Sequence, residues 1–345
     1  MKPVIVFLKT CFKFCLKIAL ALNVDLILNR NKLIVLMYHG VTDKNTPRGS
    51  VQNYDGKHVF VEKFEKQIRM LSKRYTPISL DNLNVWLLNG KKLPRNPILF
   101  TFDDGYKNNH DVVYPILNKY NIPAIIFICP HLVTKINWPD SIENLLTQTN
   151  KNHVSLTLRG KNLQFDLTTD AKKIKSIIKI KKELSIIPSE ERNKKIEDMI
   201  KITKIKQNFV HGHSLMCWDE IKELSRNNIA IQSHSLTHPI MSMENVSILE
   251  KEFADSKKII EQKLNNKVTA FAYPNGAFND TVKELARKTG YLFAFSTKQG
   301  KNNKKTDLFE IRRIPVTNNQ DNYLLFTNLF FNFNKILFKT RKLIK

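Results

Sequence analysis

The sequence contains Ile98-Leu99-Phe100-Thr101-Phe102-Asp103-Asp104-Gly105-Tyr106, an apolar run that ends at two adjacent carboxylates and a glycine. The length and composition of this run predict a buried strand, and such a strand is typical of a parallel sheet or barrel. Neighbouring side chains of a regular strand point to opposite faces, so Asp103 and Asp104 can share a site only if the chain turns there. Gly105 gives the backbone the freedom to turn. The alternative is an ordinary surface turn.

Strand and helix patterns alternate over residues 32–316. Strand–helix–strand units build parallel sheets, and this many repeats favour a (β/α) barrel over an open sheet. In such a barrel the chemistry gathers at the carboxyl ends of the strands. Further strands are predicted at residues 32–38, 122–128, 229–232, 268–273, 292–295 and 310–316.

Residues 138–212 interrupt this alternation. They are rich in lysine, contain helical patches and include one candidate hairpin. We interpret them as a mainly helical insertion between two strands of the barrel, which forms a lid or a subdomain on the substrate side. The predicted organisation is a basic amphipathic segment at residues 1–30, the barrel with its insertion at 31–316, and a basic amphipathic tail at 317–345.

The chain is strongly basic, with 56 Lys and Arg against 31 Asp and Glu, a net charge of +25. Such an excess suits nucleic acid, an anionic membrane surface or an acidic substrate. Because the excess is mostly lysine and is spread over the whole chain, a compositional bias explains it equally well. We therefore keep the membrane surface as a partner and expect no nucleic acid.

The two ends of the chain mix apolar and basic residues. Lysines interrupt the first 30 residues, so no apolar run reaches the ~20 residues that a spanning helix needs. A helix lying in the membrane interface fits this pattern, and a helix packed on the barrel is the alternative. We expect a cytoplasmic protein peripheral to the inner membrane; the alternative is export to the periplasm or cell surface.

A second polar motif, Ser233-His234-Ser235-Leu236-Thr237-His238, follows the predicted strand 229–232. Histidines at positions i and i+4 share one face of a helical turn, the spacing that places two ligands on one metal. Two histidines and a carboxylate are a ligand set for catalytic zinc, and they also suit other divalent transition metals. One aspartate of the acidic pair would then bind the metal and the other would act as a base. The neighbouring hydroxyl groups are expected to orient the imidazole nitrogens.

These motifs carry a resemblance to a known family. Thr101-Phe102-Asp103-Asp104-Gly105 and His234-Ser235-Leu236-Thr237-His238 resemble the first two motifs of the polysaccharide deacetylases (carbohydrate esterase family 4, the chitooligosaccharide deacetylase homology domain). Phe271-Ala272-Tyr273-Pro274-Asn275-Gly276 is similar to the third. Met37-Tyr38-His39-Gly40 and Cys217-Trp218-Asp219 resemble elements of a branch that includes the poly-N-acetylglucosamine deacetylases. The resemblance covers residues 33–316 apart from the insertion.

The resemblance implies a distorted (β/α) barrel and a metal-dependent hydrolase. Such an enzyme removes N-acetyl groups from amino sugars of a polysaccharide, an oligosaccharide or a lipid-linked glycan. By motif match, Asp104, His234 and His238 bind one divalent metal, and Asp103 is the general base that acts on a metal-activated water. Zn²⁺ is the expected metal, with Co²⁺, Ni²⁺ and Mn²⁺ as alternatives. The backbone N–H of Tyr106 would stabilise the oxyanion.

Two departures from the family pattern leave alternatives open. Ala272 stands where many members carry an arginine that orients the base, and Arg312 or Arg313 is a candidate replacement. The C-terminal histidine that commonly supplies the acid in this family is absent, because no histidine follows His238. In the branch that carries the Met-Tyr-His element the acid comes from that strand end, so the resemblance implies His39, with a packed or capping histidine as the alternative. The remaining substrate-binding candidates are Tyr273, Pro274 and Trp218, of which Trp218 suits a core position equally well. A barrel that binds carbohydrate or membrane without turnover is the alternative function.

Overall fold

The computed structural model of the chain describes residues 22–29, 32–42, 53–205 and 214–318, together with the single residues Ile18, Val51 and Leu325. Most of the two predicted basic terminal segments therefore lies outside the described residues. The described part of the first segment contains the short helix α2 (Val24–Asn29). Within these ranges, no helix combines the length and the apolar character that crossing a membrane requires.

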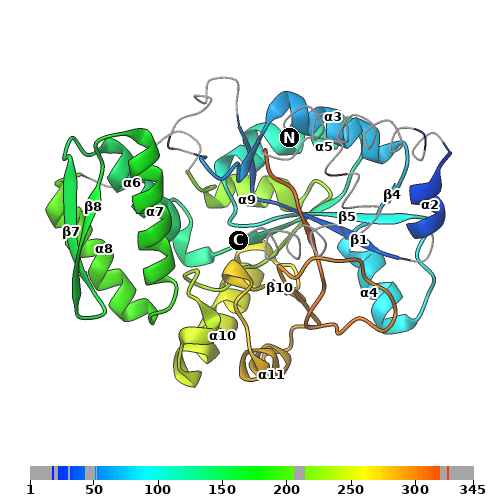
Figure 1. Cartoon of the computed structure of the whole chain (residues 1–345). Helices are drawn as coiled ribbons and strands as arrows, with labels where there is room; N and C mark the ends of the chain where they lie inside the picture. The colour runs from blue at the N-terminus through cyan, green and yellow to red at the C-terminus, as the bar shows by residue number, and fades with distance from the viewer. Residues whose placement is uncertain are drawn as a thin grey trace, which may run out of the picture.

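A sheet of parallel strands in the order β11-β10-β9-β6-β5-β1-β12 forms the centre of the molecule (Figure 1). Ile311 pairs with Phe295 of β11, and Ile314 pairs with Leu36 of β1, so the segment 311–315 connects the two edges of the sheet. The predicted distorted (β/α) barrel is thereby confirmed, although the strand expected at 310–316 is much shorter. The strands are β1 (Ile34–Tyr38), β5 (Pro97–Phe102), β6 (Ala124–Ile128), β9 (Ile229–Ser233), β10 (Ala270–Ala272), β11 (Phe293–Phe295) and β12 (Ile314–Pro315), and β4 (Thr76–Pro77) pairs with the start of β5.

Helices cover the outside of this sheet (Figure 1). Their apolar stripes pack on the outward side chains of the strands and form the largest apolar cluster of the protein. Asn279 caps the start of α11, where its side chain accepts a hydrogen bond from the Val282 N–H at 2.9 Å. The helices are α3 (Val61–Ser72), α4 (Leu80–Asn89), α5 (Tyr114–Lys119), α9 (Trp218–Ser225), α10 (Val246–Leu264) and α11 (Asp280–Lys288), and a short π-helix (Asn109–Val113) precedes α5. β2 (Gly40–Thr42) and β3 (His58–Phe60) pair separately.

The strands bury both faces, and alternate residues belong to different apolar clusters. In β5, Ile98 and Phe100 pack against the helices, whereas Leu99 belongs to an inner cluster built from β1, β6, β10, β11 and α4. Because the side-chain period of a strand is two, Thr101 and Asp103 continue the row of Leu99 toward the carboxyl end of β5. The polar residues that follow the strands are therefore aimed at the interior of the barrel.

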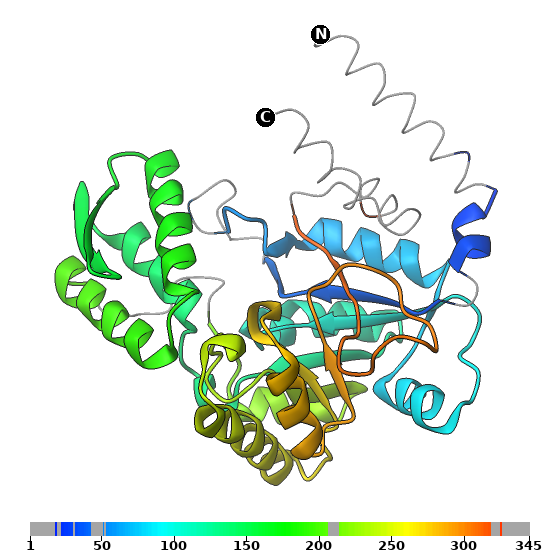
Figure 2. The ribbon, with the colours of Figure 1, turned by 60° about the horizontal axis from the view of Figure 1, so that its bottom comes forward.

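The insertion forms a lobe beside the barrel in both ribbon views (Figures 1 and 2). It has its own apolar cluster, in which Ile177 and Ile180 of one helix pack with Leu156 and Phe165 of a hairpin. The lobe therefore has a core separate from that of the barrel. Its elements are α6 (Trp138–Gln148), the antiparallel pair β7 (His153–Leu158) and β8 (Lys161–Asp166), α7 (Asp170–Leu184) and α8 (Ser189–Thr203).

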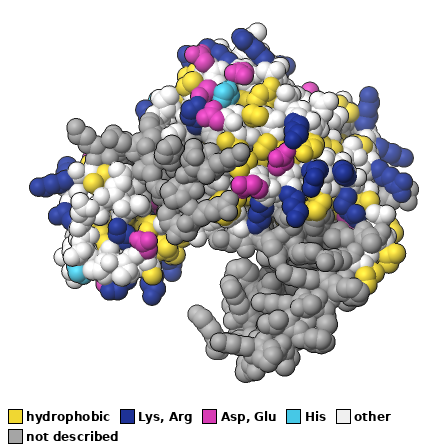
Figure 3. Space-filling model, turned by 90° about the horizontal axis from the view of Figure 1, so that it is seen from above, with side chains coloured by type: hydrophobic (Ala, Val, Ile, Leu, Met, Phe, Trp, Pro, Cys, Tyr) yellow, Lys and Arg dark blue, Asp and Glu magenta, His cyan; other side chains and the backbone are white. Residues whose placement is uncertain are grey.

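Basic side chains are distributed over the described surface. On the face shown in Figure 3, Lys and Arg lie among Asp, Glu and apolar side chains and do not form one continuous patch. Several lysines pair with surface carboxylates, such as Lys119 with Glu65 at 2.7 Å and Lys283 with Asp307 at 2.6 Å. This distribution agrees with a compositional origin for much of the positive charge.

Candidate active site

The acidic motif forms a tight turn directly after β5. Asp104 and Gly105 both adopt left-handed backbone conformations, with φ of 75° and 74°. A Cβ atom on residue 105 would lie 2.8 Å from Cγ2 of Ile128, so the turn requires glycine for space as well as for conformation. Both carboxylates are buried at the end of the barrel. The turn thus brings Asp103 and Asp104 into one site, which excludes an ordinary surface turn.

The two histidines lie in a loop after β9, not in a helical turn, so that part of the sequence prediction is wrong. Ser235 and His238 have positive φ of 70° and 60°, which interrupts any helix. Glu252 of α10 holds the loop by accepting hydrogen bonds from the backbone N–H groups of Leu236 at 2.7 Å and Thr237 at 3.0 Å. A buried carboxylate from a distant helix therefore fixes the spacing of the two imidazoles.

The neighbouring hydroxyl groups also differ from expectation. Ser235 Oγ accepts a hydrogen bond from the His238 backbone N–H at 2.9 Å, and Thr237 Oγ1 donates to Glu252 at 2.5 Å. They stabilise the loop backbone and do not orient the imidazole rings. The ring of His234 is oriented instead by the Ala272 carbonyl, which accepts a hydrogen bond from Nδ1 at 2.7 Å. With Nδ1 used as a donor, Nε2 of His234 keeps a lone pair that is available for a metal ion.

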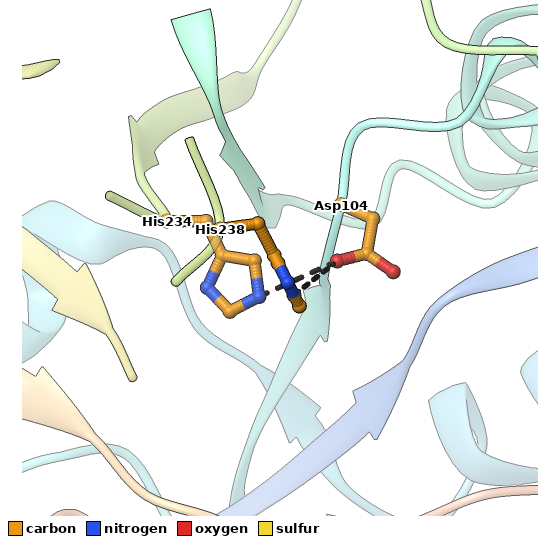
Figure 4. A group of neighbouring side chains, drawn as sticks. All are labelled: Asp104, His234 and His238. Atoms are coloured by element: carbon orange, nitrogen blue, oxygen red, sulfur yellow. Dashed lines mark ion pairs between the residues drawn. The ribbon is translucent and has the colours of Figure 1, made fainter. Parts of the chain in front are cut away.

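Asp104, His234 and His238 form a cluster that fits a divalent metal (Figure 4). Asp104 Oδ1 lies 3.4 Å from Nε2 of His234 and 3.3 Å from Nε2 of His238. One ligand atom from each residue lies within 4.8 Å of the other two. Among the described residues, no group makes a hydrogen bond to this buried oxygen. Burial raises the pKa of Asp104, but the two adjacent histidines outweigh it and hold the pKa well below its usual value. An ionised oxygen facing two imidazole nitrogens is a suitable donor set.

Asp103 is held by Arg313, which lies within the 311–315 connection between the sheet edges. Nη1 and Nη2 of Arg313 donate to Oδ1 and Oδ2 of Asp103 at 2.7 and 2.8 Å, and both side chains are buried. Nε donates to the Ser296 carbonyl at 3.0 Å. Burial raises the pKa of Asp103, but the Arg313 guanidinium more than offsets this and the pKa lies below its usual value. Arg312 is exposed, and its backbone bonds to Asn302. Of the two candidates, the structure places Arg313 against the acid.

A cavity of about 580 Å³ opens beside these residues and extends to the insertion. Its walls include His39, Asp103, Asp104, His234, His238 and Tyr273. Burial lowers the pKa of His39, although the carboxylates of Asp104 and Asp103 favour its charged form. The hydroxyl of Tyr273 donates to the Phe309 carbonyl at 3.1 Å, so the ring is fixed in the wall.

Two of the predicted substrate residues do not line this cavity. Trp218 begins α9, packs against the outer apolar cluster and has Lys263 Nζ 5.9 Å from its ring centroid. Pro274 is buried in a short 3₁₀ turn after β10. Neither is among the described lining residues. The motif position alone did not indicate which side of the barrel wall these side chains occupy.

Comparisons with known proteins agree with this arrangement. A family model described as polysaccharide deacetylase matches residues 90–294, more than half of the chain. The chain belongs to the polysaccharide deacetylase family. As a member, it is a hydrolase of the polysaccharide deacetylase type, acting on the carbon–nitrogen bond of N-acetyl groups in glycans. The resemblance carried by the acidic and histidine motifs is thereby confirmed.

Individual relatives are distant but cover most of the chain. YxkH of Bacillus subtilis (strain 168), named for this family, is 22% identical over 83% of this chain and 72% of its own. The poly-β-1,6-N-acetyl-D-glucosamine N-deacetylase of Staphylococcus aureus (strain MSSA476) is 23% identical over 89% of this chain and 81% of its own. The structure of the Streptococcus pyogenes deacetylase PplD in complex with acetate aligns with a TM-score of 0.58 and 18% identity, over 87% of this chain and 99% of the other. The structure of IcaB from Ammonifex degensii aligns with a TM-score of 0.56 and 16% identity, over 87% of this chain and 98% of the other. These structural alignments support the fold.

A buried polar cluster lies beside the deacetylase site, and the sequence patterns did not predict it. Lys57 Nζ donates to Tyr106 Oη and to Asp140 Oδ1, both at 2.6 Å, and Tyr106 Oη donates to Asp140 Oδ2 at 2.6 Å. Burial lowers the pKa of Lys57, but Asp140 more than offsets it and the pKa is raised. The three residues come from the loop before β3, the acidic turn and the insertion. No spacing within the sequence relates them, so no local pattern could have indicated the cluster.

The backbone of Tyr106 is also fixed next to the site. Tyr106 pairs with Leu215 in an isolated antiparallel bridge. The hydrogen bonds of this bridge come from the amides of Lys107, at 2.7 Å to Ser214 O, and Met216, at 3.0 Å to Gly105 O. The Tyr106 N–H is therefore not used by the bridge, which keeps it available as a donor at the end of the acidic turn.

Proposed function

We propose that this chain is a metal-dependent deacetylase of N-acetylated amino sugars, with Asp104, His234 and His238 as the metal ligands. The observation that carries the proposal is the buried Asp104 oxygen, which faces two imidazole nitrogens and accepts no hydrogen bond within the described part of the chain. A bound divalent metal supplies Lewis acidity for a water molecule and for the acetyl carbonyl. Zn²⁺ is the first choice for this donor set, with Co²⁺, Ni²⁺ and Mn²⁺ as alternatives.

Asp103 serves as the general base in this proposal. Its bidentate contact with Arg313 keeps it ionised and fixes its orientation, so that it accepts a proton from the attacking water. The Tyr106 N–H donates to the developing oxyanion. His39 lies in the cavity wall and delivers a proton to the leaving amine. Because burial favours the neutral ring, His39 has to take up that proton before the amine leaves.

The proposed substrate is a glycan that contains N-acetylglucosamine, either as a polymer or linked to a lipid. The name of the Staphylococcus aureus relative, a poly-β-1,6-N-acetyl-D-glucosamine N-deacetylase, supports this choice. Metal analysis of the purified protein, followed by acetate release from a panel of N-acetylated sugars with and without a chelator, tests the proposal. Metal-free protein that binds glycan but releases no acetate would favour a non-catalytic barrel instead.

We further propose that the protein works in the cytoplasm at the surface of the inner membrane. Four of the large apolar side chains near the N-terminus are exposed, namely Ile18, Leu22, Ile27 and Leu28, and Ile27 is 71% exposed. Lysines precede them in the sequence, and each basic residue near an anionic membrane contributes about 1 kcal/mol. Full-length protein in the membrane fraction, released by high salt or alkaline carbonate, would support this location. A shortened mature chain in the periplasm or the medium would contradict it.

A further inference from the structure

A second cavity, of about 600 Å³, opens at the amino end of the barrel strands. Its wall includes Leu33, which directly precedes β1, and Pro97, the first residue of β5. His39 and Asp103 of the candidate active site directly follow the same two strands. The two cavities therefore lie at opposite ends of the barrel, and the proposed reaction makes no use of the second one.

The inner wall of this cavity is apolar. Leu33, Pro97 and Trp86 of α4 line it and are buried. The loop that leads from α4 to β5 adds the half-buried Leu93 and the exposed Pro94 to the same wall. Such a wall binds hydrocarbon and offers little to a fully hydrated ion.

The rim of the cavity is positively charged. Lys92, Lys304 and Lys305 line it, and all three are exposed. Within the described ranges, none of the three makes an ion pair. The acid that follows Lys305 most closely in the sequence, Asp307, pairs with Lys283 at 2.6 Å. The rim therefore keeps its charge, beside an apolar wall.

Positive groups also crowd together next to this cavity. Asn302 and Leu33 exchange backbone hydrogen bonds, each of 2.9 Å, which places the segment 301–305 beside the start of β1. Burial lowers the pKa of Lys301 to about 8, and the charge of Lys32 acts in the same direction. The amino end of the barrel thus attracts anions more strongly than the three rim lysines would alone.

Exposed apolar side chains lie at the same end of the molecule. In both ribbon views α2 lies on the side of the barrel away from the insertion (Figures 1 and 2). Its Asp25 pairs with Arg74 and accepts a hydrogen bond from Tyr75 at 2.9 Å, and these two residues lead into β4, which pairs with the start of β5. Ile27 and Leu28 of α2 are exposed. An apolar helix surface next to a cationic cavity is complementary to an anionic bilayer.

We propose that this second cavity binds an anionic phospholipid of the membrane. The phosphate lies among Lys92, Lys304 and Lys305, and the glycerol and the upper part of an acyl chain pack on the apolar wall. A soluble phosphate ester matches the rim but not the wall, so the lipid is the occupant that uses both. The inference rests on the membrane location proposed above. It also orients the protein, because with this end on the bilayer the active site opens toward the aqueous side.

The first test measures binding of the full chain to phosphatidylcholine vesicles with and without phosphatidylglycerol. The triple variant Lys92→Gln, Lys304→Gln and Lys305→Gln should bind the anionic vesicles about 100-fold more weakly, since each lysine near an anionic surface contributes about fivefold. Its unfolding temperature should be unchanged, because all three side chains are exposed.

A matched control removes the same charge from the other end of the molecule. Lys151, Lys161 and Lys175 are exposed, belong to the insertion and lie outside the cavity. Their triple substitution by Gln should leave vesicle binding within about twofold of the unchanged chain, because these side chains face away from the bilayer. Equal losses in the two triple variants would overturn the site.

The second test separates a lipid from a free phosphate. Calorimetric titration with a short-chain phosphatidylglycerol below its micelle concentration should show binding that depends on the three rim lysines, whereas glycerol 3-phosphate should bind at least tenfold more weakly. Brominated acyl chains should quench the fluorescence of Trp86, which lines the cavity, and Trp86→Phe should remove this quenching. Equal affinity for the lipid and for glycerol 3-phosphate would overturn the proposal.

The outcomes also distinguish the site from the proposed location. Protein in the cytoplasmic membrane fraction whose lipid binding is indifferent to the three lysines would overturn the site and retain the location. Lysine-dependent binding of phosphatidylglycerol by a chain that is found in the periplasm or the medium would retain the site and overturn the cytoplasmic location.

Discussion

Replacing Arg313 with methionine should damage both the stability and the reaction of this deacetylase. The guanidinium is fully buried and binds both oxygens of Asp103, at 2.7 and 2.8 Å. Methionine has a similar length but cannot donate, so Asp103 would stay buried without its partner. Breaking a buried ion pair from one side costs about 3–5 kcal/mol. The Ser296 carbonyl loses its hydrogen bond as well.

This loss of unfolding free energy should lower the unfolding temperature by on the order of 10 °C. Circular dichroism or calorimetry measures the change. Acetate release should fall by roughly 10²-fold or more, because a base that is no longer held drifts from its reactive geometry. The metal content should remain, since Arg313 contacts none of the three proposed ligands within the described hydrogen bonds.

The neighbouring residue provides a matched control. Arg312→Met removes the same charge one position away, from an exposed side chain, and should change the free energy of unfolding by no more than about 0.5 kcal/mol. In the double variant Arg313→Met with Asp103→Asn, the loss of stability should be smaller than the sum of the single losses, because the unpaired charge is gone. Equal unfolding temperatures for the Arg312 and Arg313 variants would refute the argument that the ion pair is structurally required.

Four further outcomes are expected. His238→Ala should leave a folded protein that has lost most of its bound metal, measured by elemental analysis. Asp103→Asn should keep the metal and the fold and lower the rate by roughly 10²–10⁴-fold; loss of metal in this variant would mean that the two acids were assigned in the wrong order. His39→Ala should lower turnover with the metal retained, and a near-normal rate would transfer the acid role elsewhere. Lys57→Met should lower stability by about 3 kcal/mol in denaturant unfolding, since buried Asp140 loses its cation; an unchanged midpoint would show that this cluster does not hold the insertion.

Local sequence patterns predicted most of the barrel. The run 98–102 consists of apolar residues and one β-branched threonine, which is typical of a strand that is covered on both faces, and this indicated the parallel architecture. The positions of Asp103, Asp104 and His234 at strand ends followed too, because a strand ends where its apolar residues end. The start of α11 also depends on a local contact, the hydrogen bond that the Asn279 side chain accepts from a backbone N–H three residues later.

Tertiary structure decided the contacts between segments that are far apart in the sequence. Arg312 and Arg313 are adjacent and chemically identical, and only the path of the 311–315 connection, which pairs with β11 and then with β1, turns one into the barrel and the other to solvent. The histidine spacing predicted a helical turn, but Glu252 from α10 stabilises a loop instead. Trp138, in the insertion, reaches the cavity because Asn137 binds Tyr106. Local sequence patterns determine the side-chain periodicity and the ends of each helix and strand. The contacts named here depend instead on how the barrel closes and on where the insertion packs.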